Sequence, residues 1–255
     1  MNTTKFLSTM CFLWLCCQLP NQSARATTSC AYNFATGSGN NLLKYCVTAN
    51  GNIPQIQGPS GVSLIATGRS EGYGICNESP AQNYTDYGVS STGNWRPSVL
   101  LSQTSSSVQI ARTTNDGNWT LTQTISETNS SAINVVMALK NNQAVQRVAY
   151  LVRYAEPFPE TFFEGADSAL GWNDDYNSNT NTPGLGLVLQ NVGKPPFGFW
   201  QGYVQMVPSG PNACAFAYYA AINGSYQGSG SIEIAYVGPV LAGGTNTITL
   251  GYRPF

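Results

Sequence analysis

The chain has 255 residues and a formal net charge of −1, and only 9% of its residues are charged. It carries no basic stripe that could neutralise phosphates, so nucleic acid is not an expected partner. It contains no histidine, which excludes Ser-His-Asp and Cys-His catalysis and histidine-ligated zinc or copper.

The N-terminus has the features of a secretory signal peptide. Lys5 precedes an apolar run from Phe6 to Leu19, and Ala24-Arg25-Ala26 places small residues where signal peptidase accepts them. The run is shorter than the roughly 20 residues that span a bilayer, so we expect residues 1–26 to be removed rather than to anchor the chain. No later stretch is apolar enough to cross a membrane, and the mature protein, residues 27–255, is expected to be secreted or extracellular.

Alternation of period two recurs along the mature sequence, whereas helical periodicity is hard to find. The first predicted hairpin pairs Leu42–Ala49 with Ile53–Gln57. Asn50 and Gly51 lie between them, and Asn-Gly is a strong hairpin signal because both central residues of a type I′ turn need positive φ.

A second predicted hairpin pairs Ser107–Thr113 with Trp119–Ile125 across the turn Asn115-Asp116-Gly117. These two segments alternate apolar and polar residues, as strands with one buried face do. The turn residues are those that tight turns prefer.

A third predicted hairpin pairs Ala132–Leu139 with Val145–Tyr154, with Lys140–Gln143 in the turn. In the second of these segments Val148, Tyr150, Val152 and Tyr154 share one face. We expect Arg147 and Arg153 to lie on the face opposite the valines and tyrosines.

Further short strands complete an all-β pattern that predicts an antiparallel β-sandwich. They are expected at Val62–Thr67, Val99–Gln103, Gly186–Gln190, Gly202–Val207, Ala213–Ile222, Ser231–Val237 and Thr245–Tyr252. An irregular acidic loop, residues 155–183, separates possible halves 27–154 and 184–255. We expect one domain, with two packed halves as the alternative.

Four cysteines remain once the leader is removed: Cys30, Cys46, Cys76 and Cys214. An even number in an exported chain predicts two disulfides. A zinc site of four thiolates usually has two close pairs with about two to four residues between partners, and these spacings are far wider. Four cysteines allow three pairings, which the sequence does not decide; we expect Cys30 with Cys46 and Cys76 with Cys214.

Half of the acidic residues lie in the loop 155–183: Glu156, Glu160, Glu164, Asp167, Asp174 and Asp175. Converging carboxylates suit Ca²⁺, so a calcium site could draw on Glu156, Glu164, Asp167, Asp174 and Asp175. A solvated acidic loop is the favoured interpretation. The same acids could supply the carboxyl pair of a glycosidase, although no residue is assigned a catalytic role.

Four aromatic residues near predicted loops and strand ends are candidates for a sugar-stacking platform, because tyrosine and tryptophan offer a flat apolar face with a polar rim. They are Trp95, Trp172, Trp200 and Tyr203. The alternative for each is a place in the core.

Several segments resemble a group of exported bacterial proteins of unknown role. They are KYCVTANGNI at Lys44–Ile53, EGYGIC at Glu71–Cys76, Gly93–Trp95, Arg153–Ala155 and Ser168–Asn173. In that group aspartates often follow the Arg-Tyr-Ala step, whereas Glu156-Pro157 follows it here. The resemblance implies export and β structure, and it does not imply any activity.

The sequence therefore predicts a secreted or cell-surface, disulfide-stabilised β-sandwich whose leading role is non-catalytic recognition of a glycan or a surface protein. A carboxylate-based carbohydrate-active hydrolase or lyase is the main alternative, and a purely structural surface protein is the third. No cofactor other than Ca²⁺ is suggested.

Overall fold

The computed structural model describes the main part of the chain after the leader. The described residues are 29–58, 61–65, 71–88, 93–128, 131–157, 161–165, 168–172, 186–192, 199–205, 212–214, 225–227 and 231–254. The expected leader, residues 1–26, lies outside them. Among the described residues no helix has the length and apolarity to cross a membrane.

A four-stranded sheet is built from the N-terminal part of the chain. Its strands follow in sequence order: β1 (Cys30–Thr36), β2 (Leu43–Thr48), β3 (Gln55–Gln57) and β4 (Ser63–Ile65). All neighbours are antiparallel, and the 3-10 helix η1 (Gly39–Asn41) connects β1 to β2.

The predicted β2–β3 hairpin is confirmed, but the predicted turn type is wrong. The amide of Thr48 donates to the carbonyl of Asn52 at 2.9 Å, and Gly51 has a φ of +90°, which glycine adopts without steric cost. Asn50 is not in the positive-φ region that a type I′ turn requires of both central residues. The turn is therefore a wider loop that needs glycine at one position.

A five-stranded antiparallel sheet forms a second unit. Its strands, in spatial order, are β15 (Phe199–Gln205), β17 (Ser231–Val240), β11 (Arg147–Ala155), β5 (Glu71–Asn77) and β6 (Gln82–Asp86). Leu151 and Ile234 contribute to the main core, whereas Val152 and Ala235 form a smaller cluster on the opposite face. Both faces of this sheet are thus buried at its centre.

A nine-stranded antiparallel sheet is the largest unit. Its strands, in spatial order, are β16 (Ser225–Gln227), β12 (Thr161–Gly165), β13 (Ser168–Trp172), β14 (Gly186–Asn191), β18 (Thr245–Pro254), β10 (Ile133–Asn141), β9 (Trp119–Glu127), β8 (Ser107–Thr113) and β7 (Val99–Gln103). Along β9, Trp119 and Leu121 are buried while Thr120 and Thr122 are half-buried, as the alternating sequence predicts.

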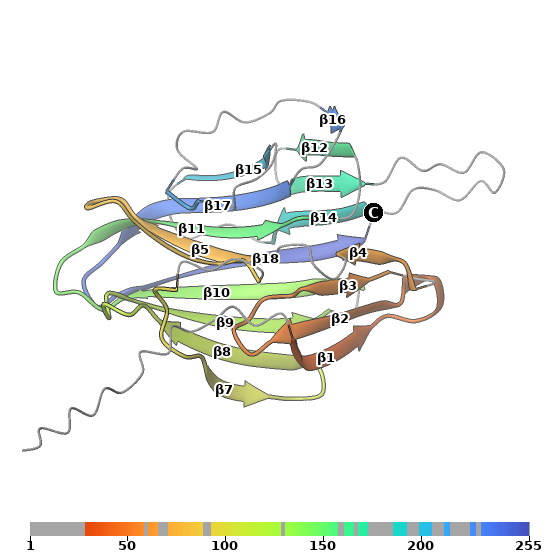
Figure 1. Cartoon of the computed structure of the whole chain (residues 1–255), viewed down its shortest axis with the longest axis horizontal. Coiled ribbons are helices and arrows are strands. Elements are labelled where there is room, and N and C mark those ends of the chain that lie inside the picture. Colours follow the sequence, from red (N-terminus) through yellow and green to blue (C-terminus); the bar gives the residue numbers. More distant parts are fainter. Residues whose placement is uncertain are drawn as a thin grey trace, which may run out of the picture.

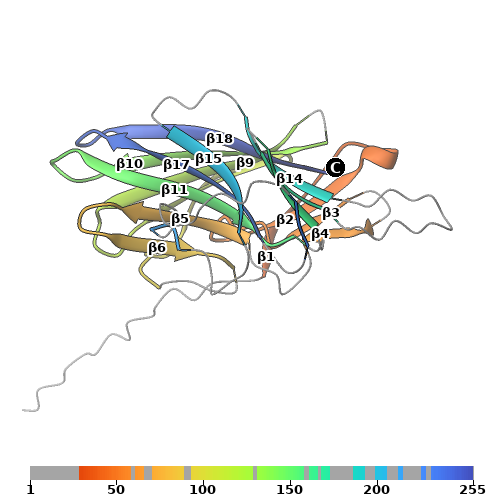
Figure 2. The ribbon, with the colours of Figure 1, turned by 90° about the horizontal axis from the view of Figure 1, so that it is seen from above.

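The two smaller sheets lie side by side over one face of the nine-stranded sheet (Figures 1 and 2). One continuous hydrophobic core joins all three, with contributions from Tyr45, Ile56, Ile75, Leu151, Trp119 and Leu250 among others. The predicted antiparallel β-sandwich is therefore confirmed.

The β8–β9 hairpin is confirmed in register, with Thr113 opposite Thr120 and Ser107 opposite Ser126. The predicted pairing of β10 with β11 is wrong. β10 pairs with β9 and β18, whereas β11 pairs with β5 and β17. The connection from Asn142 to Gln146 therefore crosses from the nine-stranded sheet to the five-stranded sheet. β10 and β11 each bury an apolar face against the opposite sheet and do not pair with each other.

The stretch 155–183 is not the continuous irregular loop that we predicted. β12 and β13 lie within it and pair with each other, and β13 also pairs with β14. Of the predicted strand Ala213–Ile222, residues 213 and 214 lie in a turn, and the remainder is outside the described residues.

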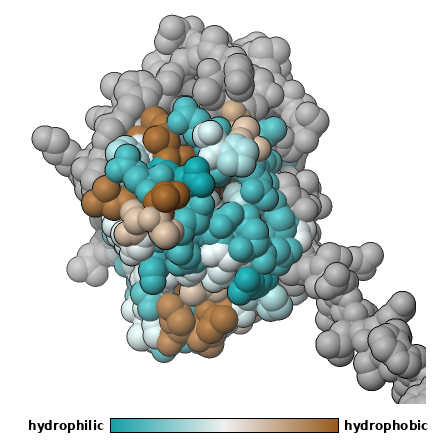
Figure 3. All heavy atoms as spheres, turned by 90° about the vertical axis from the view of Figure 1, so that its left-hand side faces the viewer, coloured by the Kyte–Doolittle hydropathy of each residue, from teal (hydrophilic) through white to brown (hydrophobic). Residues whose placement is uncertain are grey.

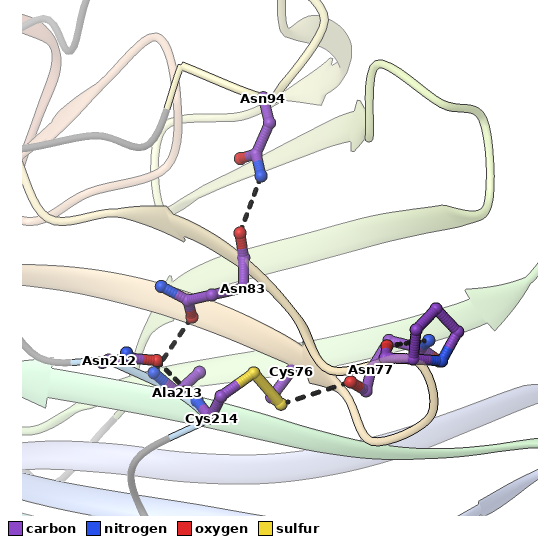
Figure 4. The surroundings of a disulfide bond; sticks show 8 residues. Cys76, Asn77, Asn83, Asn94, Asn212, Ala213 and Cys214 are labelled. Atoms are coloured by element: carbon purple, nitrogen blue, oxygen red, sulfur yellow. Dashed lines mark hydrogen bonds between the residues drawn. A yellow bond between two sulfur atoms is a disulfide. The ribbon is translucent and has the colours of Figure 1, made fainter.

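Both disulfides have the expected pairing. Cys30–Cys46 joins β1 to β2, and Cys76–Cys214 joins β5 to a segment 138 residues later. Figure 4 shows the second bond beside Asn83, whose Oδ1 accepts the amide of Ala213 at 3.1 Å. This crosslink holds residues 212–214 against the five-stranded sheet.

β7 is the edge strand of the nine-stranded sheet, and Val99, Leu100 and Leu101 on it are each about half exposed. Hydrophobic residues gather at the lower end of the molecule in Figure 3, the end where β7 lies in Figure 1. An edge strand leaves backbone groups unpaired on one side, so this border of the sheet is open to further strand pairing.

Removing the Cys76–Cys214 bond should cost more stability than removing Cys30–Cys46. Closing a loop of 138 residues restricts the unfolded chain by the equivalent of about 5 kcal/mol, against about 3 kcal/mol for a loop of 16 residues. Urea unfolding of the variant Cys76→Ala/Cys214→Ala and of Cys30→Ala/Cys46→Ala measures the two losses. Equal losses would contradict the expectation.

Candidate functional site

Arg153 of β11 lies where the three sheets meet. Its guanidinium is 2.5 Å from Glu71 Oε1 of β5 and donates to Gln123 Oε1 of β9 at 2.6 Å. It also donates to the carbonyl of Gly51 in the β2–β3 turn at 3.3 Å. The Tyr252 hydroxyl donates to Glu71 Oε1 at 2.7 Å. One side chain thereby joins the five-stranded sheet, the nine-stranded sheet and the hairpin of the four-stranded sheet.

Arg112 of β8 makes a second, similar set of contacts. Its Nη1 is 2.5 Å from Asp86 Oδ2 of β6 and donates to the Tyr73 hydroxyl at 2.9 Å. Asn50 Nδ2 donates to the same Asp86 oxygen at 3.1 Å, and the guanidinium lies 5.2 Å from the centre of the Trp95 ring. We call the four charged residues of these two sets, Glu71, Asp86, Arg112 and Arg153, the polar junction.

The polar junction is closed to solvent, because its side chains are 0% or 1% exposed. Burial raises the pKa of the Glu71 carboxyl, and Arg153 lowers it by a smaller amount. Burial also disfavours the charged form of Arg153, but Glu71 and Tyr252 together outweigh it and raise the pKa of the guanidinium. The four charged side chains are paired with one another between strands of different hairpins, so the polar junction is a structural feature.

Breaking one ion pair of the polar junction should destabilise the fold strongly. Glu71→Gln or Arg153→Met alone leaves one charge buried without its partner, which costs about 3–5 kcal/mol. The double variant removes both charges and should cost clearly less than the two single losses together. A double-mutant cycle by urea denaturation measures this coupling, and additive losses would show that the pair is not coupled.

An open groove of about 370 Å³ lies on the outer face of the four-stranded sheet. The polar residues that line it are Asn33, Lys44, Gln55, Gln57 and Ser105; we call it the amide groove. The strands β1 to β3 lie at the lower right of Figure 1, and Ser105 comes from the turn between β7 and β8.

Strand register sets the layout of the amide groove. Asn33 and Gln55 both lie opposite Cys46, and in the next row Gln57 lies opposite Lys44. Neighbouring strands are about 4.8 Å apart, and residues two apart on a strand are about 6.8 Å apart. The intervening residues, such as Phe34, point into the core, so the groove has a rigid floor.

The chemistry of the amide groove suits a hydroxylated ligand. Each carboxamide offers two N–H donors and an acceptor oxygen, and sugar hydroxyls need both. A volume of about 370 Å³ falls within the range of small-molecule sites. Among the described residues that line the groove, Lys44 is the one charged side chain.

A second polar cluster lies on the face of the five-stranded sheet that points away from the nine-stranded sheet. Glu233 lies directly opposite Tyr154, and both are buried. The Tyr87 ring is 5.3 Å from the Tyr154 ring, and a Cβ at Gly74 would lie 2.7 Å from the Tyr87 hydroxyl. We call Glu233, Tyr87 and Tyr154 the Glu233 cluster.

Tyr87 is protonated at neutral pH. Burial raises the pKa of its hydroxyl well above 10, and the nearby charge of Glu233 raises it further. The hydroxyl has no hydrogen-bond partner among the described residues. The Glu233 cluster thus combines a carboxyl group with a protonated phenol that has hydrogen-bonding capacity to spare.

Of the predicted aromatic platform, Trp95 is 1% exposed and packs edge-on against Tyr73 at 5.6 Å. It is a core residue whose ring faces are covered, and no sugar can stack on it. Trp172, Trp200 and Tyr203 lie in β13 and β15, but their side chains are outside the described part of the structure.

Of the predicted calcium ligands, Glu156 is half-buried after β11. Glu164 lies in β12 with its side chain undescribed, and Asp167, Asp174 and Asp175 fall outside the described residues. Among the residues that the structure does describe, no three histidine, cysteine or carboxylate side chains are grouped as metal ligands. A calcium site in this loop stays a prediction.

The sequence analysis assigned a strand face to Arg153, but it did not single out the other residues of the polar junction or those of the amide groove as sites, although a signal existed. Gln55 and Gln57 flank the buried Ile56, which marks an outward polar row. Arg112 and Gln123 occupy inward positions of β8 and β9, where alternation calls for apolar residues. A polar residue at an inward position needs a buried partner.

Comparison with known proteins adds a shared fold. No protein-family model matches the chain, and neither does any curated protein sequence. A protein assigned as an aldose 1-epimerase from Escherichia coli K12 superposes with a TM-score of 0.50 at 11% identity, over 88% of this chain and 99% of its own.

Two larger enzymes contain a similar sandwich. A bacterial glucoamylase complexed with acarbose matches with a TM-score of 0.58 at 7% identity over 89% of this chain. A heparan sulfate lyase from Pedobacter heparinus matches with a TM-score of 0.50 at 10% identity over 90% of this chain. This chain spans 33% and 36% of their lengths. At such identities the likeness shows the fold alone: a β-sandwich that also occurs in carbohydrate-active enzymes.

Proposed function

We propose that the protein binds a carbohydrate and that the amide groove holds it. The observation that carries the proposal is the set of three carboxamides, Asn33, Gln55 and Gln57, arranged in two rows on one rigid sheet. The sheet fixes the backbone positions of these three residues, so the spacing of their amide groups is largely set before a ligand binds. The glucoamylase and the lyase that share the fold act on carbohydrates by name, which supports a ligand of this class.

We further propose that binding takes place outside the cell. Two disulfides are compatible with an oxidising compartment, and the N-terminal leader predicts export. The ligand would then be a glycan of a cell surface or of the surrounding medium.

Loss of two carboxamides should weaken glycan binding. Each neutral hydrogen bond contributes about 0.5–1.5 kcal/mol, so Gln55→Ala/Gln57→Ala should lower the affinity about tenfold for glycans that an array identifies. Gln82→Ala is the matched control, because Gln82 is exposed on β6 of the other small sheet. Titration calorimetry gives the affinities. Unchanged binding by the double variant, or no binding by the parent protein to any glycan, would remove the support for this site.

Catalysis is a second candidate function, favoured by the Glu233 cluster and by the enzymes that share the fold. Glu233 offers a carboxyl group for proton transfer, and Tyr87 offers a phenol that is protonated at neutral pH, as an ordinary tyrosine is, with its pKa raised by burial. Without histidine, carboxyl and phenol groups of this kind are among the side chains left for proton transfer in a hydrolase or lyase. Glu233 and Tyr87 are buried, so this face would have to open to admit a sugar chain.

The catalytic hypothesis predicts that Glu233→Gln lowers kcat/KM about 100-fold or more on a cleaved glycan, with Tyr87→Phe lowering it as well. Reducing-end and unsaturated-product assays on the glycans that bind measure hydrolysis and elimination. Circular dichroism checks that each variant is folded, and Gln82→Ala serves again as the control. Full activity of Glu233→Gln, or the absence of any cleavage product, would leave binding as the sole function.

A further inference from the structure

The electrostatics of the amide groove point to the kind of glycan that it accepts. Lys44 lies in the middle strand of the three that line the groove, and its side chain is exposed. It forms no ion pair with a carboxylate among the described residues. The other described side chains of the lining are neutral, so Lys44 gives the lining its positive charge; the charge of Glu127 acts on the buried Tyr45 hydroxyl.

The space beside Lys44 is open on one side. Lys44 faces Ala35 across β1 and Gln57 across β3. The Ala35 side chain ends at its Cβ and therefore leaves room beside Lys44 on this face of the sheet. An anionic group placed there would contact Lys44 while Gln57 and Asn33 remained available for hydroxyl groups.

The whole chain would not attract an anion by itself, because its formal net charge is −1. Any preference for an acidic ligand must therefore arise locally. An ion pair with Lys44 in the amide groove would provide it, and this pair would be formed only by a glycan that carries a carboxylate or a sulfate.

We propose that the amide groove binds an acidic glycan, with the carboxylate or sulfate of one sugar paired with Lys44 and the neighbouring hydroxyls bonded by Asn33, Gln55 and Gln57. This inference rests on the proposed glycan-binding function and names its ligand class. It assigns Lys44 as the residue that determines specificity for charge.

The test uses the mature chain and matched pairs of probes that differ in charge. One pair is a tetragalacturonate and its fully methyl-esterified form, and the other is a heparan sulfate oligosaccharide and its desulfated form. They are printed on an array with neutral glycans, and bound members are titrated by calorimetry. The variants are Lys44→Gln, Lys44→Arg and the control Lys140→Gln, since Lys140 is an exposed lysine on β10 of another sheet.

We expect the acidic form of at least one pair to bind about fivefold more tightly than its neutral form, as an exposed ion pair allows. The pair that shows the preference distinguishes a carboxylate ligand from a sulfate ligand. Lys44→Gln should abolish the preference, while Lys44→Arg and Lys140→Gln should keep it. Added salt should reduce it, because an exposed ion pair is screened.

The other outcomes separate this inference from the proposed function. If neutral glycans bind as tightly as acidic ones, or if Lys44→Gln keeps the preference, the acidic specificity is overturned and glycan binding stands. If no glycan on the array binds, both are overturned.

Discussion

The buried ion pairs of the polar junction are the constraint on which the rest of the structure depends. Arg153 and Glu71 are removed from water, so each can be accommodated only in the arrangement that brings the other to it. Arg153 also donates hydrogen bonds to the Gly51 carbonyl and to Gln123, and these bonds hold the four-stranded sheet against the two others. The amide groove lies on the outer side of that sheet, and its rigidity follows from this anchoring.

Much of the local structure could be predicted from residue patterns. Alternation predicted β8 and β9 in their correct pairing, because the short turn at Gly117 places the two strands that it joins side by side. It failed for β10 and β11, since alternation defines a buried face but does not say which strand lies alongside. Arg153 was assigned to the face opposite the valines and tyrosines, which is correct, yet that face is the main core rather than the surface.

The candidate sites could be predicted less well, because they depend on register and on contacts between distant segments. The grouping of Asn33, Lys44 and Gln55 requires the pairing of three strands, which no single segment shows. The Glu233 cluster brings together residues from β11, β17 and the position after β6, far apart in the chain. The fold is shared with a protein assigned as an epimerase, a glucoamylase and a lyase, but a shared fold does not identify a site, and the absence of histidine excludes only imidazole chemistry.

The central claim is that the amide groove is where a glycan binds. Nuclear magnetic resonance of the labelled protein tests it most directly, because the side-chain N–H₂ signals of Asn33, Gln55 and Gln57 report contact at each carboxamide. On addition of a bound glycan, these signals and the backbone amides of β2 should shift while the side-chain signal of Gln82 stays in place. Shifts confined to β11, β17 and the residues around Glu233, with the groove unchanged, would contradict the account.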